Sequence, residues 1–163
     1  MKGKDKVSVL FVCLGNICRS PTAQGIFHRL VLSEGLDERV EIDSAGTGDW
    51  HVGKPPDPRS LDAAQKRGLN IAGLRARQVS PSDFDKFDYI LAMDERNLAD
   101  LRAMSPPHYQ GVLDLFLNFG GHPDYREVPD PYFQGGRSFE LVLDLIESAS
   151  EGLLAHIREH HLR

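Results

Sequence analysis

The segment from Cys13 to Pro21 carries the residue types of this chain that could do chemistry. Cys13 and Arg19 stand six positions apart in it, with Gly15 and Asn16 between them. A thiolate is a strong nucleophile, and the planar guanidinium fork of arginine matches two oxygens of a phosphate group. Glycine and asparagine most readily adopt positive φ, which a tightly curled loop with inward-pointing N–H groups requires. The segment therefore predicts a phosphate cradle that holds a nucleophile.

Two predicted elements must position this loop. The stretch Val7 to Val12 is rich in β-branched residues and free of Gly and Pro, which predicts a buried strand that ends just before Cys13. After Pro21, apolar residues recur at helical spacing, and proline is tolerated in the first turn of a helix. Backbone N–H groups and the positive end of the helix dipole can then converge on an anion. An ordinary strand-turn-helix corner with a buried cysteine is the alternative interpretation.

Strand-like and helix-like stretches alternate along the rest of the chain. The further strands are expected at residues 40–42, 89–93 and 112–116, and the further helices at 58–67, 95–104 and 138 to about 160. This alternation predicts βαβ units and a parallel sheet. A length of 163 residues with 40% hydrophobic content suits one globular domain, and we expect a single domain over residues 1–163. Ligands of open α/β sheets gather at the carboxyl ends of the strands, where the Cys13 loop is predicted.

Composition excludes several classes of partner. The net charge of −5, with no dense run of Lys or Arg, argues against a nucleic-acid or anionic-membrane surface. Both cysteines lie in the loop, so thiols can build neither a disulfide framework nor a four-ligand zinc site. No apolar segment reaches membrane-spanning length, and the lysine-flanked stretch at Val7 to Val12 is too short for a signal peptide. We therefore expect a cytoplasmic protein; no pattern specifies an oligomeric state.

The loop from Cys13 to Pro21 resembles the phosphate-binding loop of the low-molecular-weight protein tyrosine phosphatases. Later segments that are similar to the family are 43–46, 55–57, 87–94 and 130–132. The resemblance implies a flavodoxin-like α/β fold, with a parallel four-stranded sheet flanked by helices. It also implies hydrolysis of phosphotyrosine in proteins, or of small aryl phosphates, through a cysteinyl-phosphate intermediate. No metal or cofactor is expected, and phosphate-like oxyanions are expected to inhibit.

Cys13 is the predicted nucleophile because it leads the loop and lies six residues before Arg19. Cys18 lies at the far end of the loop and is expected to be a packed small residue. Arg19 and the loop backbone are expected to bind the phosphoryl group, and the loop residues concerned are Leu14, Gly15, Asn16, Ile17 and Cys18. The family resemblance adds two supporting roles: Ser20 hydrogen-bonds the thiolate, and Ser44 supports Asn16.

A phosphomonoester also needs an acid to protonate its leaving oxygen, and two Asp-Pro pairs compete for that role. Asp57-Pro58 precedes an amphipathic stretch, so Asp57 is best explained as a helix N-cap. Asp130-Pro131 leads into an aromatic and glycine-bearing loop, which by itself is compatible with a plain turn. Because the family places its general acid in an Asp-Pro-Tyr segment, the resemblance assigns Asp130 as acid for cleavage and base for hydrolysis.

Aromatic walls are expected to set the substrate size. By similarity to the family, Trp50 and Tyr132 line a deep slot that admits a phosphotyrosine ring and leaves phosphoserine short of Cys13. One departure concerns Leu74, which stands where many relatives have a histidine, so any role of that histidine in bracing the loop is in question. His156 and His160 are interpreted as residues of a frayed surface helix end.

Several other functions remain open. Arsenate reductases share the fold and loop, but their thiol relay needs cysteines beyond the loop, and this chain has none. A rhodanese-like persulfide carrier uses a cysteine loop without calling for Asp130 and an aromatic slot. A non-catalytic phosphopeptide-binding module is the third alternative. A curled loop also brings Cys13 and Cys18 towards each other, so peroxide is expected to inactivate the protein reversibly through a disulfide between them.

Overall fold

The computed structural model describes residues 6–120, 122–131 and 137–162. Four parallel strands form one sheet in the order β2-β1-β3-β4. Their bounds are β1 Val7–Cys13, β2 Val40–Gly46, β3 Tyr89–Ala92 and β4 Val112–Leu115. The helices are α1 Arg19–Ser33, α2 Pro58–Gln65, α3 Asp83–Lys86, α4 Glu95–Met104 and α5 Arg137–His161, with the 3-10 turn η1 at Phe116–Phe119. The α/β fold with a parallel four-stranded sheet is therefore confirmed.

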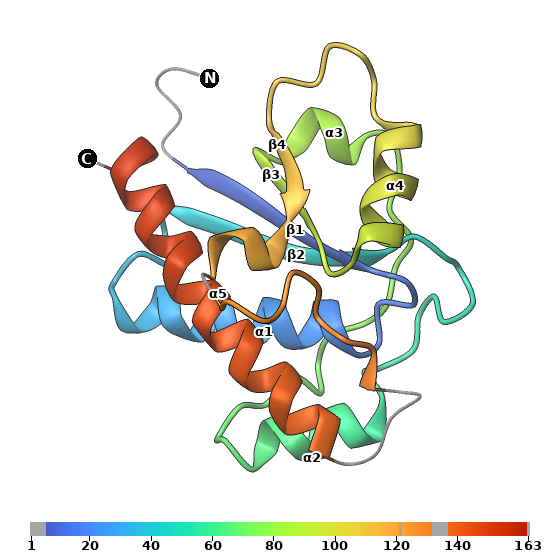
Figure 1. The fold of residues 1–163 in the computed structure, drawn as a ribbon, viewed down its shortest axis with the longest axis vertical. Helices are drawn as coiled ribbons and strands as arrows, with labels where there is room; N and C mark the ends of the chain where they lie inside the picture. The colour runs from blue at the N-terminus through green and yellow to red at the C-terminus, as the bar shows by residue number, and fades with distance from the viewer. Residues whose placement is uncertain (1–5, 121, 132–136, 163) are drawn as a thin grey trace.

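Helices cover both faces of the sheet, so the central strands β1 and β3 are buried throughout (Figure 1). Side chains of a strand alternate between the two faces. Val9, Phe11 and Cys13 of β1 join the core beneath α1 and α5, whereas Leu10 and Val12 join a second core beneath α3 and α4. All seven β1 residues are buried, which explains why every one of them except Ser8 is apolar.

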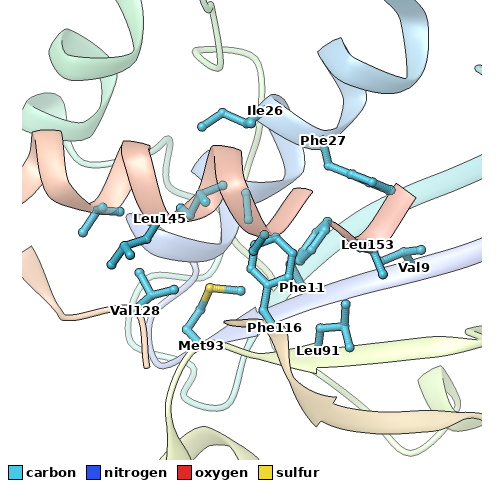
Figure 2. Packing of buried hydrophobic residues seen from close by; sticks show 14 of the residues in the cluster. Val9, Phe11, Ile26, Phe27, Leu91, Met93, Phe116, Val128, Leu145 and Leu153 are labelled. Atoms are coloured by element: carbon cyan, nitrogen blue, oxygen red, sulfur yellow. The ribbon is translucent and has the colours of Figure 1, made fainter. Parts of the chain in front are cut away.

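Aromatic side chains fill the larger core. Phe11 of β1 meets Phe27 of α1 and Phe116 edge-to-face, with ring centroids 5.7 and 4.9 Å apart (Figure 2). Edge-to-face pairs stabilise a fold by roughly 0.5–1.5 kcal/mol beyond the area they bury. This packing fixes the central strand against α1, and the loop between these two elements carries Cys18 and begins directly after Cys13.

The sheet order places this loop at a switch in chain direction. From β1 the chain first moves outward to β2 and later returns to β3 on the other side of β1. Connections that leave a strand in opposite directions open a crevice at its carboxyl end, which is where open α/β sheets bind ligands. Cys13 is the last residue of β1. The nucleophile candidate therefore lies at the floor of that crevice.

The predicted elements differ from the observed ones mainly at their ends. Helix α1 begins at Arg19, two residues before Pro21, and β2 continues four residues past Ile42 to Gly46. The short elements α3 and η1 were not predicted. One prediction was wrong: His156 is no frayed surface residue, because its ring packs edge-to-face on Tyr89 and Phe119.

Candidate active site

The loop between β1 and α1 curls tightly. Asn16 has φ of +57°, a left-handed conformation that asparagine tolerates better than most residues. Gly46, at the end of β2, lies against the same loop. A Cβ atom at Gly46 would be 2.7 Å from the Leu14 carbonyl oxygen, so only glycine allows this approach.

The Cys13 thiol is buried at the centre of the loop. The Asn16 backbone N–H donates to its Sγ at 3.3 Å, and the Ser20 hydroxyl lies 3.0 Å from the same sulfur. Donors that converge on sulfur stabilise the thiolate over the thiol, as does the N-terminus of a helix. Two polar groups thus contact the Cys13 sulfur.

Arg19 lies beside Cys13 as a buried cation, only 4% exposed. Its Nη1 donates to Asp94 Oδ2 at 2.8 Å and to the Val128 carbonyl oxygen at 3.0 Å, and its Nη2 lies 3.8 Å from Asp130 Oδ2. Burial opposes the charge, but the negative groups around it, first Cys13 and then Asp94, raise the pKa of Arg19 above its usual value. The guanidinium is therefore permanently charged and fixed in direction.

Backbone donors surround the space above the sulfur. In the part of the chain that the structure describes, the N–H groups of six loop and helix-start residues donate to no protein acceptor: Leu14, Gly15, Ile17, Cys18, Arg19 and Ser20. Unpaired N–H groups at a helix N-terminus form an anion site, because the helix dipole adds to their own partial charges. Together with Arg19 they supply the donors that a dianion such as a phosphate monoester needs.

A cavity of about 180 Å³ opens above Cys13. Its lining contains three reactive or charged groups together with loop and wall residues: Cys13, Leu14, Gly15, Ile17, Cys18, Arg19, Trp50, His51 and Asp130. Trp50 is 66% exposed, so its ring stands at the mouth and not in the core. Apolar walls above a cationic floor fit a ligand with an aromatic ring and an anionic group.

The structure brings most of the predicted site residues together. Ser20 and Ser44 both accept a hydrogen bond from Asn16 Nδ2, at 2.8 and 3.0 Å. Tyr132 lies outside the described residues. Asp57 caps α2, because its Oδ1 accepts from the Arg59 N–H at 2.8 Å, as the sequence predicted.

Cys18 differs sharply from Cys13 in its surroundings. Its sulfur accepts a hydrogen bond from the Ser60 hydroxyl at 3.0 Å, and burial raises the pKa of the Cys18 thiol to about 12. Cys18 is therefore a neutral thiol at physiological pH, packed as the sequence predicted. The two sulfurs also differ in their donors, a backbone N–H of the loop for Cys13 and a side-chain hydroxyl of α2 for Cys18.

Sequence reasoning missed Asp94 and His51 as site residues. Asp94 uses one carboxylate oxygen to pair with Arg19 and the other to accept from the Asn97 N–H, which begins α4. A signal was available for it, because Asp94 follows the predicted strand beside β1 and so lies at the same sheet edge as Cys13. His51 lies in a loop of irregular structure with no pattern to mark it.

The described residues contain no group of three or more His, Cys, Asp or Glu side chains arranged to hold a metal ion. None of the helices in this part of the chain is both long and apolar enough to cross a membrane.

The fold and the cradle define an α/β protein with a phosphate-type loop built around a cysteine and an arginine. A model of the family "Low molecular weight phosphotyrosine protein phosphatase" matches residues 8–162. The chain belongs to this family, and it is a protein-tyrosine-phosphatase.

Individual relatives match over nearly their whole length. The low molecular weight protein-tyrosine-phosphatase YfkJ of Bacillus subtilis is 44% identical over 153 residues, which cover 94% of this chain and 97% of the relative. A protein tyrosine phosphatase of Entamoeba histolytica, solved with Hepes in the active site, has a TM-score of 0.90 at 38% identity, covering 94% of this chain and 98% of its own. Vibrio vulnificus Wzb, solved with benzylphosphonate, has a TM-score of 0.78 at 25% identity, covering 92% and 98%.

Proposed function

We propose that this chain hydrolyses phosphotyrosine in proteins, and small aryl phosphates, through a covalent cysteinyl-phosphate intermediate. The observation that carries the proposal is the meeting of Cys13, Arg19 and Asp130 in one cavity lined by unpaired N–H groups. Benzylphosphonate, the ligand of the Vibrio relative, combines an aromatic ring with a tetrahedral oxyanion. The walls formed by Trp50 and Ile17 suit the same combination in this chain.

The first step transfers the phosphoryl group to sulfur. The Cys13 thiolate attacks phosphorus, and the bond between phosphorus and the phenolic oxygen breaks. Arg19 and the loop N–H groups hold the three non-bridging oxygens, whose charge they stabilise in the transition state. Asp130 gives its proton to the departing oxygen, so the tyrosine leaves as a neutral phenol.

The second step releases phosphate. Asp130, now a carboxylate, takes a proton from a water molecule that attacks phosphorus, and the bond between phosphorus and sulfur breaks. Inorganic phosphate leaves and the thiolate returns. Phosphate and similar oxyanions therefore compete for the loop as inhibitors. Because the proposed steps need a reduced Cys13, they fit the reducing cytoplasm that the cysteine usage predicts.

A phosphate-release assay on matched phosphotyrosine and phosphoserine peptides tests this proposal. We expect Cys13→Ser to abolish turnover while it still binds oxyanions, and Arg19→Lys to be severely impaired because the bidentate fork is lost. Phosphotyrosine should be hydrolysed far faster than phosphoserine. Substantial turnover by Cys13→Ser would overturn the nucleophile assignment. Tight phosphopeptide binding by the parent without phosphate release would instead support a non-catalytic binding module.

A further inference from the structure

A chain of side-chain hydrogen bonds leads away from Cys13 and ends at Gln24, a residue that no step of the proposed reaction uses. The Ser20 hydroxyl lies 3.0 Å from Cys13 Sγ, and Asn16 Nδ2 donates to that hydroxyl at 2.8 Å. Asn16 Nδ2 also donates to the Ser44 hydroxyl at 3.0 Å. The Ser44 hydroxyl in turn donates to Gln24 Oε1 at 2.6 Å, the shortest link of the chain.

Each hydroxyl has one proton, which limits the directions that the hydrogen bonds of this chain can take. Asn16 Oδ1 accepts from the Arg77 backbone N–H at 2.9 Å, which turns both amide protons of Asn16 towards the two serines. Ser20 and Ser44 then accept from Asn16, and each must donate its own proton elsewhere. The Ser20 hydroxyl has two acceptors within reach, Cys13 Sγ at 3.0 Å and the more distant Ala45 carbonyl oxygen at 3.4 Å, whereas the Ser44 hydroxyl donates to Gln24.

The acceptor at Gln24 holds Ser44 in the rotamer that presents a lone pair to Asn16. Without that acceptor, the buried Ser44 hydroxyl must turn to find another partner, and its proton then competes with the donating amide of Asn16. Asn16 is held in a left-handed conformation, and its backbone N–H donates to Cys13 Sγ at 3.3 Å. A looser Asn16 weakens both donors to the thiolate, its own N–H and the hydroxyl of Ser20.

The position of Gln24 on α1 suits this role. Gln24 lies four residues after Ser20, so both side chains project from the same face of the helix. Helix α1 thus supplies both Ser20 and Gln24, while Ser44 comes from β2 and Asn16 from the loop. Leu74 packs its half-buried side chain against the apolar core and has no polar atom that could accept the hydrogen bond of Ser44 in place of Gln24.

We propose that Gln24 is a positioning residue for the Cys13 thiolate, acting through Ser44, Asn16 and Ser20. This inference rests on the proposed function for its effect on turnover, because it takes Cys13 as the nucleophile. Its effect on the sulfur itself does not depend on turnover.

The test compares three variants of the full chain: Gln24→Leu removes the acceptor, Gln24→Glu keeps it, and His28→Leu is the matched control. His28 is exposed on the same helix, so the control introduces leucine without touching the network. Two quantities are measured across pH 4–9: kcat/KM on p-nitrophenyl phosphate, and the rate of Cys13 alkylation by iodoacetamide, located by mass spectrometry. Thermal unfolding of each variant is recorded beside them.

We expect Gln24→Leu to lower kcat/KM roughly 3- to 10-fold, the effect of one lost hydrogen bond. The midpoint pH of Cys13 alkylation should move upward, with an unfolding temperature close to that of the parent. Gln24→Glu should stay closer to the parent than Gln24→Leu, and His28→Leu should match the parent. Since Gln24 acts through Ser44, Gln24→Leu combined with Ser44→Ala should be no slower than Ser44→Ala alone.

Two results overturn the proposal: an alkylation midpoint in Gln24→Leu equal to that of the parent, or losses for Gln24→Leu and Ser44→Ala that multiply independently. A lower unfolding temperature with an unchanged midpoint likewise assigns Gln24 a purely structural role. Failure of the proposed function gives a different pattern. The parent then releases no phosphate, while the alkylation midpoint still depends on residue 24.

Discussion

The carboxylate of Asp94 contacts Arg19 of α1 with one oxygen and the first turn of α4 with the other, so substitutions can test the two contacts separately. Oδ2 pairs with Arg19, and Oδ1 accepts from the Asn97 N–H at 2.8 Å to begin α4. Asp94→Asn keeps an oxygen for the cap but removes the charge from Arg19. We expect kcat/KM to fall roughly 10- to 100-fold, since a hydrogen bond to a charged group is worth roughly 1.5–3 kcal/mol, while thermal stability changes little.

Asp94→Ala removes both contacts. It should match Asp94→Asn or exceed it in the loss of activity, and should also lower the free energy of unfolding by about 1 kcal/mol, the usual value of an N-cap. Steady-state kinetics and urea denaturation of both variants measure the two effects. Equal stability losses in the two variants would show that the cap contributes nothing.

Asp130 is tested by the dependence of rate on the leaving group. The carboxylate lines the cavity beside Arg19, and its proposed proton transfer matters most when the departing oxygen is basic. Asp130→Ala should slow an aryl phosphate with a poor leaving group by roughly 10² to 10⁴, and an activated one far less. Asp57→Ala is the matched control, because Asp57 caps α2. If only Asp57→Ala shows the leaving-group dependence, the acid has been assigned to the wrong residue.

The two cysteines predict a protected response to peroxide. An accessible thiolate is oxidised first, and a neighbouring thiol can trap the sulfenic acid as a disulfide. The parent treated with peroxide should recover activity in thiol reductants. Cys18→Ser should keep most of its activity when reduced, yet lose it irreversibly under the same oxidant. Mass spectrometry of the oxidised parent should detect the disulfide between Cys13 and Cys18. Full rescue of oxidised Cys18→Ser by reductants would assign Cys18 a packing role alone.

The site was predictable where it is local in sequence. The Cys13 loop was predicted from the seven consecutive residues Cys13 to Arg19 at the junction of a strand and a helix, whereas Asp130 needed the family resemblance. Asp94 and Gln24 were not predicted as site residues because their contacts form only when the chain folds. Asp94 lies 75 residues from its partner Arg19, and Gln24 lies 20 residues from its partner Ser44. Short polar side chains carry no periodic signal that would reveal such partners.

At the scale of elements, the packing of α5 on η1 depends on Gly152. A Cβ atom there would overlap the Phe119 carbonyl oxygen, which is backbone and cannot move aside. Gly152→Ala should therefore destabilise the protein by roughly 1–3 kcal/mol, the usual cost of overpacking, although alanine favours a helix by about 1 kcal/mol.

Gly25→Ala is the matched control for this prediction, since Gly25 also lies inside a helix. There the added methyl group meets flexible side-chain atoms of Ile71 and Leu69. Thermal denaturation should show a clearly larger loss for Gly152→Ala. A loss equal to or below that of Gly25→Ala would mean that the contact between η1 and α5 adjusts easily.

The alternation of strands and helices was predictable from the sequence because strands buried on both faces are almost entirely apolar and the main helices keep one apolar face. The first and last residues of the helices and strands were harder to predict. Arg19 and Ser20 start α1 because the loop curls directly into the helix, a contact-dependent feature. The single turns α3 and η1 are too short for a periodic pattern, so propensity could not reveal them.

At the scale of the whole molecule, the end of α5 makes stability depend on pH. The rings of Tyr89, Phe119 and His160 pack around His156, and His161 and Glu159 lie near it. Burial, followed by the charges of the neighbouring histidines, lowers the pKa of His156 below its usual 6.5. Below pH 6.5 the unfolded chain therefore binds the proton more readily, and stability is lost as the pH falls.

His156→Phe should remove this contribution. Its unfolding temperature should fall less than that of the parent between pH 7.5 and 5, so the difference in favour of the variant should grow as the pH falls. His28→Phe, at an exposed position on α1, should follow the parent. Parallel curves for His156→Phe and the parent would contradict the assignment.

The floor and the wall of the cavity above Cys13 are formed by different segments of the chain. The floor is the end of the central strand and the start of α1, whereas Trp50 and His51 come from the segment between β2 and α2. Backbone bonds at Thr47, Gly53 and Asp57 tether that segment to its surroundings. We expect this arrangement to separate the reactivity of the site from its substrate selectivity. Within the family, grafting residues 48–56 from one relative into another should transplant substrate preference while leaving the intrinsic rate towards a minimal aryl phosphate nearly unchanged, which makes the segment an exchangeable module for evolution and for engineering.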